Sequence, residues 1–524
     1  MSSEKKFQEQ EEELDDISVS LGADIDLDVL EEVALGAEVT IPAAMLKNVA
    51  ARRAKLEKLL DSGRTMYGIN TGFGHLASQK ISRENLKQLQ VNLIRSHSCG
   101  VGDPMTAEEV RALMFARAYE LARGNSGVRP VVIETLVAML NKNVIPYIPR
   151  KGSVGASGDL APSSHMALVM IGEGNACVLE GEEDTAEWLT GAEAMAKAGI
   201  KPIELAEKEG LALINGTQAM KAVGGLALQS AMNLAVNSLV IGAMTVEALK
   251  GTPVAFDKRI HDLKPHEGQK FAAEMLRDLL TDSEIRKSHA ENDDRVQDPY
   301  CLRCMPQAIG AVLDTISNSM ETFETELQSV TDNPLIVDSE DVEGSVDVLS
   351  GGNFHGQPLS FAADFAGIAL TALGNMSERR ISQMVSNFKI LPPFLAKNPG
   401  LESGFMIAHV TAAAMCNENK VLSHPASADS VPTSANQEDF VSMGMNAANK
   451  LAEIVQNTAR ILAVEVLAAA EGIEHHRPLK SSPQIEKVLS FIREIAPAAE
   501  GDDVFSDKIE DIASFLMDME LDEL

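Results

Sequence analysis

The chain has 524 residues and is strongly acidic, with 77 acidic against 45 basic side chains and a formal net charge of −32. This charge argues against nucleic acid or an anionic membrane surface as a partner, because both attract basic patches. Five cysteines, an odd number, and a charged N-terminus without a signal peptide predict a reducing, cytoplasmic environment.

Residues 1–24 are too charged and too poor in apolar side chains to offset the entropy of ordering, which predicts a flexible tail. From residue 25 to 210, helical patterns such as 106–123 and 131–141 alternate with connections that contain glycine and proline. We therefore expect this N-terminal region to carry loops that bear functional residues.

Long periodic apolar segments dominate residues 211–480 and predict a central bundle of long helices. Residues 481–524 read as short amphipathic helices at the periphery, and β-branched alternation is scarce throughout, so the predicted class is mainly α with little sheet. The predicted long helices cover 222–250, 306–329, 357–385, 404–422 and 440–472.

The uncharged run from Ala222 to Val246 is long enough to cross a bilayer. Polar residues such as Asn233 and Asn237 interrupt it, and no basic cluster flanks it. We therefore predict a helix buried at the centre of the bundle rather than a membrane span. The single Cys301/Cys304 pair has no second pair and no nearby histidine, so no metal site is expected.

The stretch from Gly152 to Pro162, GSVGASGDLAP, contains three glycines that permit tight backbone geometry. Within it, the amide nitrogen of Gly158 could attack the carbonyl carbon of Ala156 and close a five-membered ring. Loss of water from the ring, and of the Ser157 hydroxyl as a second water, would leave a conjugated methylene group. Such a group is an electrophile that no ordinary side chain supplies.

This stretch resembles the histidine and phenylalanine ammonia-lyases, whose 4-methylidene-imidazol-5-one (MIO) cofactor forms from an Ala-Ser-Gly triplet. The resemblance extends over about residues 25–524 and implies an aspartase/fumarase-like helical bundle. It also implies a homotetramer in which each active site collects residues from three chains, with no external cofactor. The other matching blocks are YGINTGFG from Tyr67, NGTQ from Asn215, QDPY from Gln297, GGNFH from Gly351 and SANQED from Ser434.

The resemblance also implies roles for two tyrosines and an arginine. Tyr67 is expected to be the base that removes the β-hydrogen of the substrate, and Tyr300 to assist proton transfer. Arg303 follows Tyr300 by three residues, so both would lie on one face of a helix. A planar guanidinium suits a bidentate pair with the substrate carboxylate.

Further matching positions are expected to bind or position the reacting groups. Asn215 and Gln297 would donate amide hydrogen bonds to the cofactor and to the carboxylate, and Asp159 would position the triplet. Phe354 would stack on the ring of the bound substrate.

Two positions bear on which amino acid is the substrate. His97 matches a histidine of the histidine-specific branch, where phenylalanine-specific relatives tend to be apolar. Glu438 is more informative, because a carboxylate can accept a hydrogen bond from an imidazole but would lack a partner beside a phenyl ring. Both positions favour deamination of L-histidine to trans-urocanate and ammonia.

Some residues depart from the pattern of the histidine-specific branch, and they leave the shape of the ring pocket open. The alternatives are a lyase or 2,3-aminomutase acting on tyrosine or phenylalanine and, more remotely, an inactive structural protein that retains the fold. The departures are Met305, Phe440, His409 and Ser163-Ser164-His165.

Overall fold

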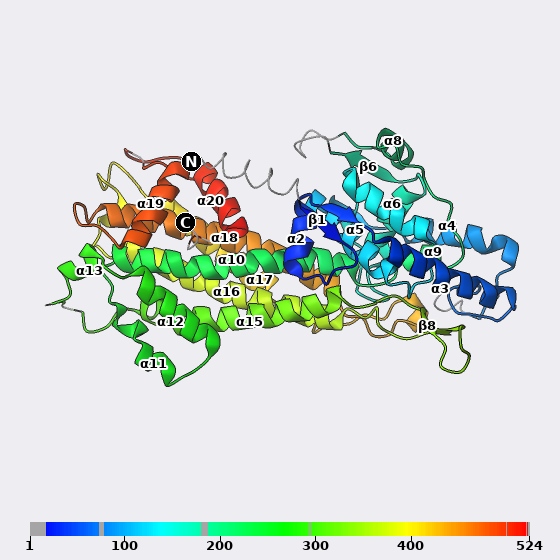
Figure 1. Cartoon of the computed structure of the whole chain (residues 1–524). Helices are drawn as coiled ribbons and strands as arrows, with labels where there is room; N and C mark the ends of the chain where they lie inside the picture. Colours follow the sequence, from blue (N-terminus) through cyan, green and yellow to red (C-terminus); the bar gives the residue numbers. More distant parts are fainter. Residues whose placement is uncertain are drawn as a thin grey trace.

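The chain folds around a bundle of long helices, which lie side by side along the lower half of the molecule in Figure 1. Four of them, α10 (Gln218–Ala248), α15 (Met305–Leu327), α16 (Gln357–Ser386) and α18 (Gly444–Glu474), pack against one another. The predicted mainly α bundle is confirmed. This computed structural model describes residues 17–72, 78–179, 187–291, 293, 295–498, 500–519 and 521.

Helix α10 is the centre of the bundle, as predicted, because it packs against α15, α16 and α18 and also against the N-terminal region. Both α10 and α16 are long and apolar enough to cross a membrane, but 78% and 61% of their apolar windows are buried inside the protein. The polar interruptions have structural partners. Asn233 and Asn237 donate to the carbonyls of Met517 (2.8 Å) and Met519 (2.7 Å), and thereby hold the C-terminal segment.

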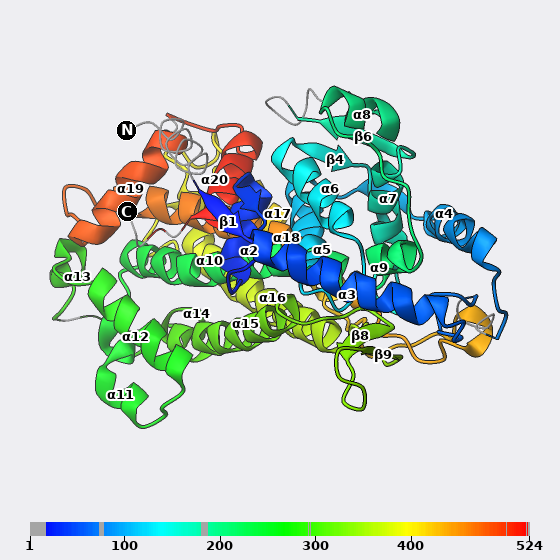
Figure 2. The ribbon, with the colours of Figure 1, turned by 45° about the vertical axis from the view of Figure 1, so that its right-hand side comes forward.

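The N-terminal region packs over one end of α10 (Figure 2). Its central helix α5 (Ala107–Ala122) begins with a capping box, in which Thr106 and Glu109 each accept a hydrogen bond from the other's backbone N–H. The other helices are α2 (Leu27–Leu35), α3 (Ala43–Asp61), α4 (Leu86–His97), α6 (Pro130–Asn141), α7 (Leu160–Met170), α8 (Gly191–Lys197) and α9 (Glu209–Ile214), with the short η2 (Arg83–Asn85).

The strands of the described residues are two to four residues long, in agreement with the small predicted sheet content. They form one three-stranded sheet, ordered β4-β6-β7, and three two-stranded pairs, β1-β2, β3-β5 and β8-β9. The strands are β1 (Ser18–Ser20), β2 (Glu38–Thr40), β3 (Val101–Pro104), β4 (Val144–Pro146), β5 (Pro149–Lys151), β6 (Asn175–Val178), β7 (Leu189–Thr190), β8 (Leu335–Asp338) and β9 (Val346–Leu349).

The predicted tail of residues 1–24 is too long, because residues 17–24 belong to the fold. Strand β1 pairs in parallel with β2, with Val19 opposite Val39. The side chains of Val19 and Leu21 are buried. Burial of this apolar surface offsets the entropy cost of ordering the segment, which the charged composition of residues 1–24 argued against. Residues 1–16 lie outside the described part.

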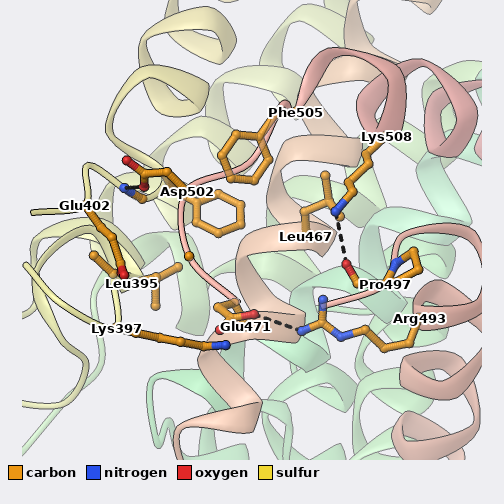
Figure 3. Close-up of a pocket in the computed structure, with 14 residues that line it drawn as sticks. Leu395, Lys397, Glu402, Leu467, Glu471, Arg493, Pro497, Asp502, Phe505 and Lys508 are labelled. Carbon is orange, nitrogen blue, oxygen red and sulfur yellow. Dashed lines mark hydrogen bonds and ion pairs between the residues drawn. The ribbon is translucent and has the colours of Figure 1, made fainter. Parts of the chain in front are cut away.

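The remaining helices flank the bundle, and α19 and α20 pack against α10 and α18 near one end of it. There, a cavity of about 40 Å³ lies between Phe405, Leu467 and Phe505 (Figure 3), where Arg493 pairs with Glu471 at 3.1 Å. The helices are η4 (Pro253–Phe256), α11 (Lys258–Asp262), α12 (Glu267–Leu279), α13 (Glu284–Ser288), α14 (Tyr300–Arg303), η5 (Pro393–Leu395), α17 (Met406–Leu422), η6 (Ser434–Asn436), α19 (Pro483–Ile495) and α20 (Ser506–Asp518).

Candidate active site

The Ala156-Ser157-Gly158 triplet lies in the loop between β5 and α7, in a strained backbone conformation. Ser157 and Gly158 have φ of +52° and +75°, in the left-handed region that favours glycine. A Cβ on Gly158 would lie 2.0 Å from the carbonyl oxygen of Gly216, so no other residue fits at this position. Ala156 is buried at 7% exposure. The loop is therefore tightly wound at the triplet itself.

Gly216 holds the triplet through two backbone hydrogen bonds. Its N–H donates to the carbonyl of Ser157 at 3.3 Å, and its carbonyl accepts from the N–H of Asp159 at 2.7 Å. Since Gly216 lies two residues before the first residue of α10, the triplet is attached to the start of the central helix.

Asp159 is completely buried. It directly precedes α7 and also contacts the first turn of α10. Its Oδ1 accepts from the hydroxyl of Ser153 at 2.9 Å, and its Oδ2 accepts from the N–H of Met220, in the first turn of α10, at 2.8 Å. Burial raises the pKa of Asp159 to about 6, although these hydrogen bonds and the charge of Arg117 act in the opposite direction. The carboxylate thus links Ser153, which precedes the triplet, to the first turn of α10.

Asn215, also predicted from the sequence, is buried next to the triplet. Its Nδ2 donates to the carbonyl of Asn333 at 2.8 Å, while its Oδ1 has no partner among the described residues. Asn333 in turn accepts from the N–H of Gly351 at 2.7 Å. This bond ties the Gly351–His355 block to the site, and Phe354 is half-buried within that block.

Glu438 reaches the triplet from a loop far along the chain. Its Oε1 accepts from the Ser157 hydroxyl at 3.3 Å, although 281 positions separate the two residues. Its Oε2 accepts from the hydroxyl of Thr433 at 2.7 Å, which orients the carboxylate. The triplet and the Glu438 carboxylate therefore meet within one chain.

His97, the last residue of α4, lies near Glu438. Its Nδ1 is 2.9 Å from the carbonyl oxygen of Leu93. Burial lowers the pKa of His97, and both this contact and the negative charge of Glu438 oppose that shift. The structure thus brings His97, Glu438, Asn215 and the triplet together.

Tyr67 is half-buried in the turn that follows α3. The turn is fixed by Asn70, whose Oδ1 accepts from the N–H of Met66 at 2.8 Å. A cavity of about 390 Å³ lies beside it, lined among others by Asn70 and Lys80. The end of this block, Phe73 and Gly74, lies outside the described residues.

A second group of predicted residues lies elsewhere. Tyr300 and Arg303 form the single turn α14, and Tyr300 is 71% exposed. The guanidinium carbon of Arg303 is 4.5 Å from the centre of the Tyr300 ring, which confirms that the two share one face. Gln297 is exposed just before them.

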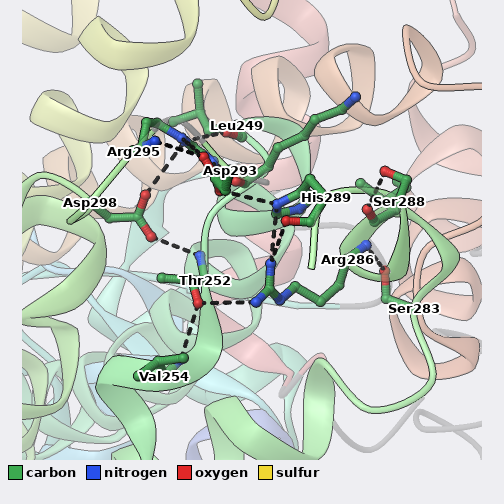
Figure 4. A network of polar contacts seen from close by, with 12 residues as sticks. Leu249, Thr252, Val254, Ser283, Arg286, Ser288, His289, Asp293, Arg295 and Asp298 are labelled. Atoms are coloured by element: carbon green, nitrogen blue, oxygen red, sulfur yellow. Dashed lines mark hydrogen bonds and ion pairs between the residues drawn. The ribbon is translucent and has the colours of Figure 1, made fainter. Parts of the chain in front are cut away.

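The turn before α14 is anchored to the C-terminal end of α10 by the polar network of Figure 4. Asp298 accepts from the N–H of Thr252 at 2.7 Å and pairs with Arg295 at 3.4 Å. Arg295 also donates at 2.9 Å to the carbonyl of Leu249, the residue directly after the end of α10. A cation at this helix end is favourable.

The two groups are far apart within one chain because α10 separates them. Asp159 contacts Met220 at its start, whereas a Cβ on Gly242 would lie 2.5 Å from Met305, just after α14. The stretch from Met220 to Gly242 spans about 33 Å at the helical rise of 1.5 Å per residue. Tyr300 and Arg303 of one chain therefore do not reach its own triplet.

Comparison with known proteins places this arrangement in a family. The model of the aromatic amino acid lyases matches residues 25–494. The chain belongs to the aromatic amino acid lyase family. It is 50% identical over 454 residues to a histidine ammonia-lyase of Koribacter versatilis (strain Ellin345), an alignment that covers 85% of this chain and 87% of that enzyme.

Solved structures of aromatic amino acid lyases share the fold over nearly the whole chain. The histidine ammonia-lyase from Trypanosoma cruzi superposes with a TM-score of 0.87 at 41% identity, covering 95% of this chain and 93% of that one. A tyrosine aminomutase from Streptomyces globisporus gives 0.88 at 36% identity, with 96% and 97% covered.

The residues that depart from the histidine-specific pattern have structural partners of their own. His165 Nε2 accepts from the N–H of Gly100 at 3.2 Å, and His409 Nε2 lies 2.7 Å from Glu378. Phe440 stacks on His355, with ring centres 5.7 Å apart. Phe440 is thus the departure that lies nearest to Glu438.

Sequence reasoning missed three residues that support the site in this aromatic amino acid lyase. Ser153 and Thr433 orient Asp159 and Glu438, and both could have been suspected only as hydroxyls close to a predicted carboxylate. The third is Arg117 in α5, and no pattern in the sequence distinguishes it, because the same helix also carries Arg111 and Glu120.

Proposed function

We propose that this protein eliminates ammonia from L-histidine and releases trans-urocanate. The observation that carries the proposal is the position of Glu438, a carboxylate within hydrogen-bond distance of the triplet and close to His97. An imidazole N–H can donate to Oε1 of this carboxylate, whereas a phenyl ring would leave Oε1 without a partner once the Ser157 hydroxyl is lost. The similarity to histidine ammonia-lyases supports the same substrate.

The residues around the triplet fit an MIO group formed from Ala156, Ser157 and Gly158. The left-handed backbone at Ser157 and Gly158 already turns the chain tightly, and the close approach of Gly216 excludes a side chain at Gly158. When formed, the group supplies an electrophile that activates the substrate for elimination. Ring formation removes the Ser157 hydroxyl, so Glu438 Oε1 then becomes available to the substrate.

The remaining residues would bind the substrate and move its proton. Arg303 would pair with the substrate carboxylate in a bidentate manner, with Gln297 beside it. Tyr67 would take the β-hydrogen, and Tyr300 would assist. Phe354 would stack on the imidazole.

Asn215 and His97 would complete the pocket from the triplet side. The Oδ1 of Asn215 has no partner among the described residues and would accept a hydrogen bond from the substrate or the cofactor. If Nδ1 of His97 donates to Leu93, its Nε2 is the acceptor that faces the imidazole N–H.

We propose a homotetramer, as the family resemblance implies. The separation of the two residue groups supports assembly, since Tyr300 and Arg303 of another copy would complete each site. The long helices offer apolar surface for such contacts. Phe361, Phe365 and Ile368 lie on one face of α16 and are 44–54% exposed, and Ile407 on α17 is 63% exposed. We propose a cytoplasmic location for this assembly, from the cysteine usage described above.

The competing function is a lyase or 2,3-aminomutase that acts on tyrosine or phenylalanine, as the similarity to the tyrosine aminomutase suggests. Product analysis separates the two. Purified protein is incubated separately with L-histidine, L-tyrosine and L-phenylalanine, and we expect urocanate from histidine alone. Cinnamate, coumarate or a β-amino acid would contradict the assignment of substrate, and no product at all would favour an inactive structural protein.

A further inference from the structure

The backbone segment on which the triplet rests is held from behind by one buried arginine. Arg117 lies in α5 and has no exposed surface. Its Nη1 donates to the carbonyl of Asn215 at 2.6 Å and to the carbonyl of Ala212 at 3.1 Å. The bond to Asn215 lies one residue before Gly216, whose backbone binds Ser157 within the triplet and Asp159 directly after it.

The other donors of Arg117 do not explain its presence. Nε and Nη2 have no partner among the described residues. Burial lowers the pKa of Arg117, whereas the charges of Glu120, Asp332 and Asp159 raise it. A buried charge is costly. Within the part of the chain that the structure describes, the hydrogen bonds of this buried arginine go only to main-chain carbonyls, so it acts by fixing the main chain.

A second residue of α5 supports the same segment. Glu120 accepts from the N–H of Thr331 at 2.9 Å and from its hydroxyl at 2.8 Å, and also from the side-chain amide of Gln218. These groups close around Gly216, where a Cβ would lie 2.6 Å from Thr331 Oγ1 and 2.7 Å from Gln218 Oε1. The segment therefore has little freedom to move away from the triplet.

We propose that Arg117 is a positioning residue for ring closure in the triplet. Through the carbonyls of Asn215 and Ala212, it keeps Gly216 against Ser157 and so restricts the triplet to the turn in which ring closure is fast. Holding two reacting atoms in place accounts for much of the rate of intramolecular reactions. The inference rests on the proposed function, because it presumes that the cofactor forms here.

The reaction that Arg117 would assist is internally balanced. A bond forms between Gly158 N and the carbonyl carbon of Ala156, and the carbonyl oxygen leaves as water with the amide hydrogens of Ser157 and Gly158. The Ser157 hydroxyl leaves as a second water with the Cα hydrogen of the same residue. No oxidant or other reactant is required.

The test compares Arg117→Lys and Arg117→Gln with the same two changes at Arg111. Arg111 is a matched control, because it is also buried in α5 and donates to the main-chain carbonyls of Val33 (2.8 Å) and Leu140 (2.9 Å), away from the triplet. The fraction of the peptide containing residues 156–158 that has lost two waters is measured by mass at fixed times after induction. Helix content and Tm are measured on the same samples.

We expect the Arg117 variants to form the ring about tenfold more slowly or worse, the loss expected for a hydrogen bond from a charged donor. The Arg111 variants should lose stability to a similar degree but form the ring like wild type. Equal ring formation in both sets would overturn the proposal. Failure of both Arg117 variants to fold, while the Arg111 variants fold, would also overturn it, since Arg117 would then be a general core residue.

The wild-type sample separates this inference from the proposed function. If its peptide shows no loss of two waters, the cofactor assignment itself fails. If wild type is dehydrated and the Arg117 variants are dehydrated equally fast, only the role of Arg117 fails.

Discussion

The two residue groups at either end of α10 differ in nearly every physical respect. The triplet and its supports, such as Asp159 and Asn215, are buried and held by hydrogen bonds within one chain. Tyr300 is exposed, and its partner Arg303 lies over the tyrosine ring. This difference fits the proposed roles, since a triplet proposed to react with itself is enclosed by its own chain, whereas the group proposed to bind substrate is exposed and accessible to another copy.

The largest expected effect is the loss of the electrophile that we propose forms in the first group, at the triplet. Ser157→Ala cannot yield the methylene group, so we expect activity to fall by at least about a thousandfold. The peptide with residues 156–158 should keep its unmodified mass, and helix content should stay at the wild-type level. Substantial turnover by this variant would show that the triplet is not the source of the electrophile.

Substitution of Arg303 should weaken substrate binding by the second group and leave ring formation in the first group unchanged. Arg303→Met should lower kcat/KM by about a hundredfold, because the pair with the substrate carboxylate is lost. Arg303→Lys should recover only part of this, since an ammonium cannot pair in a bidentate manner. Dehydration of residues 156–158 should be complete in both variants, and a loss of ring formation would contradict the separation of the two groups.

Substitution of Glu438, which lies beside the triplet, tests the proposed specificity for histidine. Glu438→Gln keeps the shape of the side chain but removes its charge, and we expect histidine turnover to fall by about tenfold to a hundredfold. Thermal stability should change little, because the hydrogen bond from Thr433 can be retained. Unchanged kcat/KM for histidine would remove the basis for the substrate assignment.

The smallest expected effect concerns the cost of burying Asp159. Its pKa is raised to about 6 in the folded chain from 3.8, so between these values the folded state binds more protons than the unfolded state. The contribution of Asp159 to stability is therefore greatest at low pH and decreases as pH rises to about 6. From pH 5 to 7 this decrease should be about 1 kcal/mol.

Urea unfolding of wild type and Asp159→Asn at pH 5 and pH 7 isolates this term, because other carboxylates contribute equally to both proteins. The unfolding free energy of wild type should therefore decrease relative to that of Asp159→Asn as pH rises from 5 to 7. The same difference at both pH values would contradict a raised pKa at Asp159.

Much of the fold could be predicted from the sequence, because the apolar periodicity of a long helix indicates where it begins and ends. α16 was expected at 357–385 and spans Gln357–Ser386. The tail boundary could not be predicted, because composition averaged over 1–24 hides the strand partner of β1, which lies at Glu38–Thr40.

The site was less accessible to sequence reasoning. Motif residues such as Asp159 and Glu438 could be named, but their contact with Ser153 and Thr433 depends on how distant loops meet. Arg117 has no motif, and its contact with Asn215 arises only when α5 packs behind the segment before α10. Local patterns do not encode such tertiary contacts.

Hybrid oligomers test most directly whether the two groups are halves of one site contributed by different copies. Ser157→Ala and Arg303→Met proteins, each nearly inactive, are mixed, dissociated and reassembled, and urocanate formation is then measured. Sites that combine the triplet of one variant with the Arg303 of the other are intact, so about a quarter of wild-type activity should return. Ser157 and Glu438 belong to the same group within one chain, so mixing their variants creates no intact site. A mixture of Ser157→Ala with Glu438→Gln should therefore remain below the activity of Glu438→Gln alone. No recovery in the first mixture, despite confirmed hybrid assembly, would contradict the account.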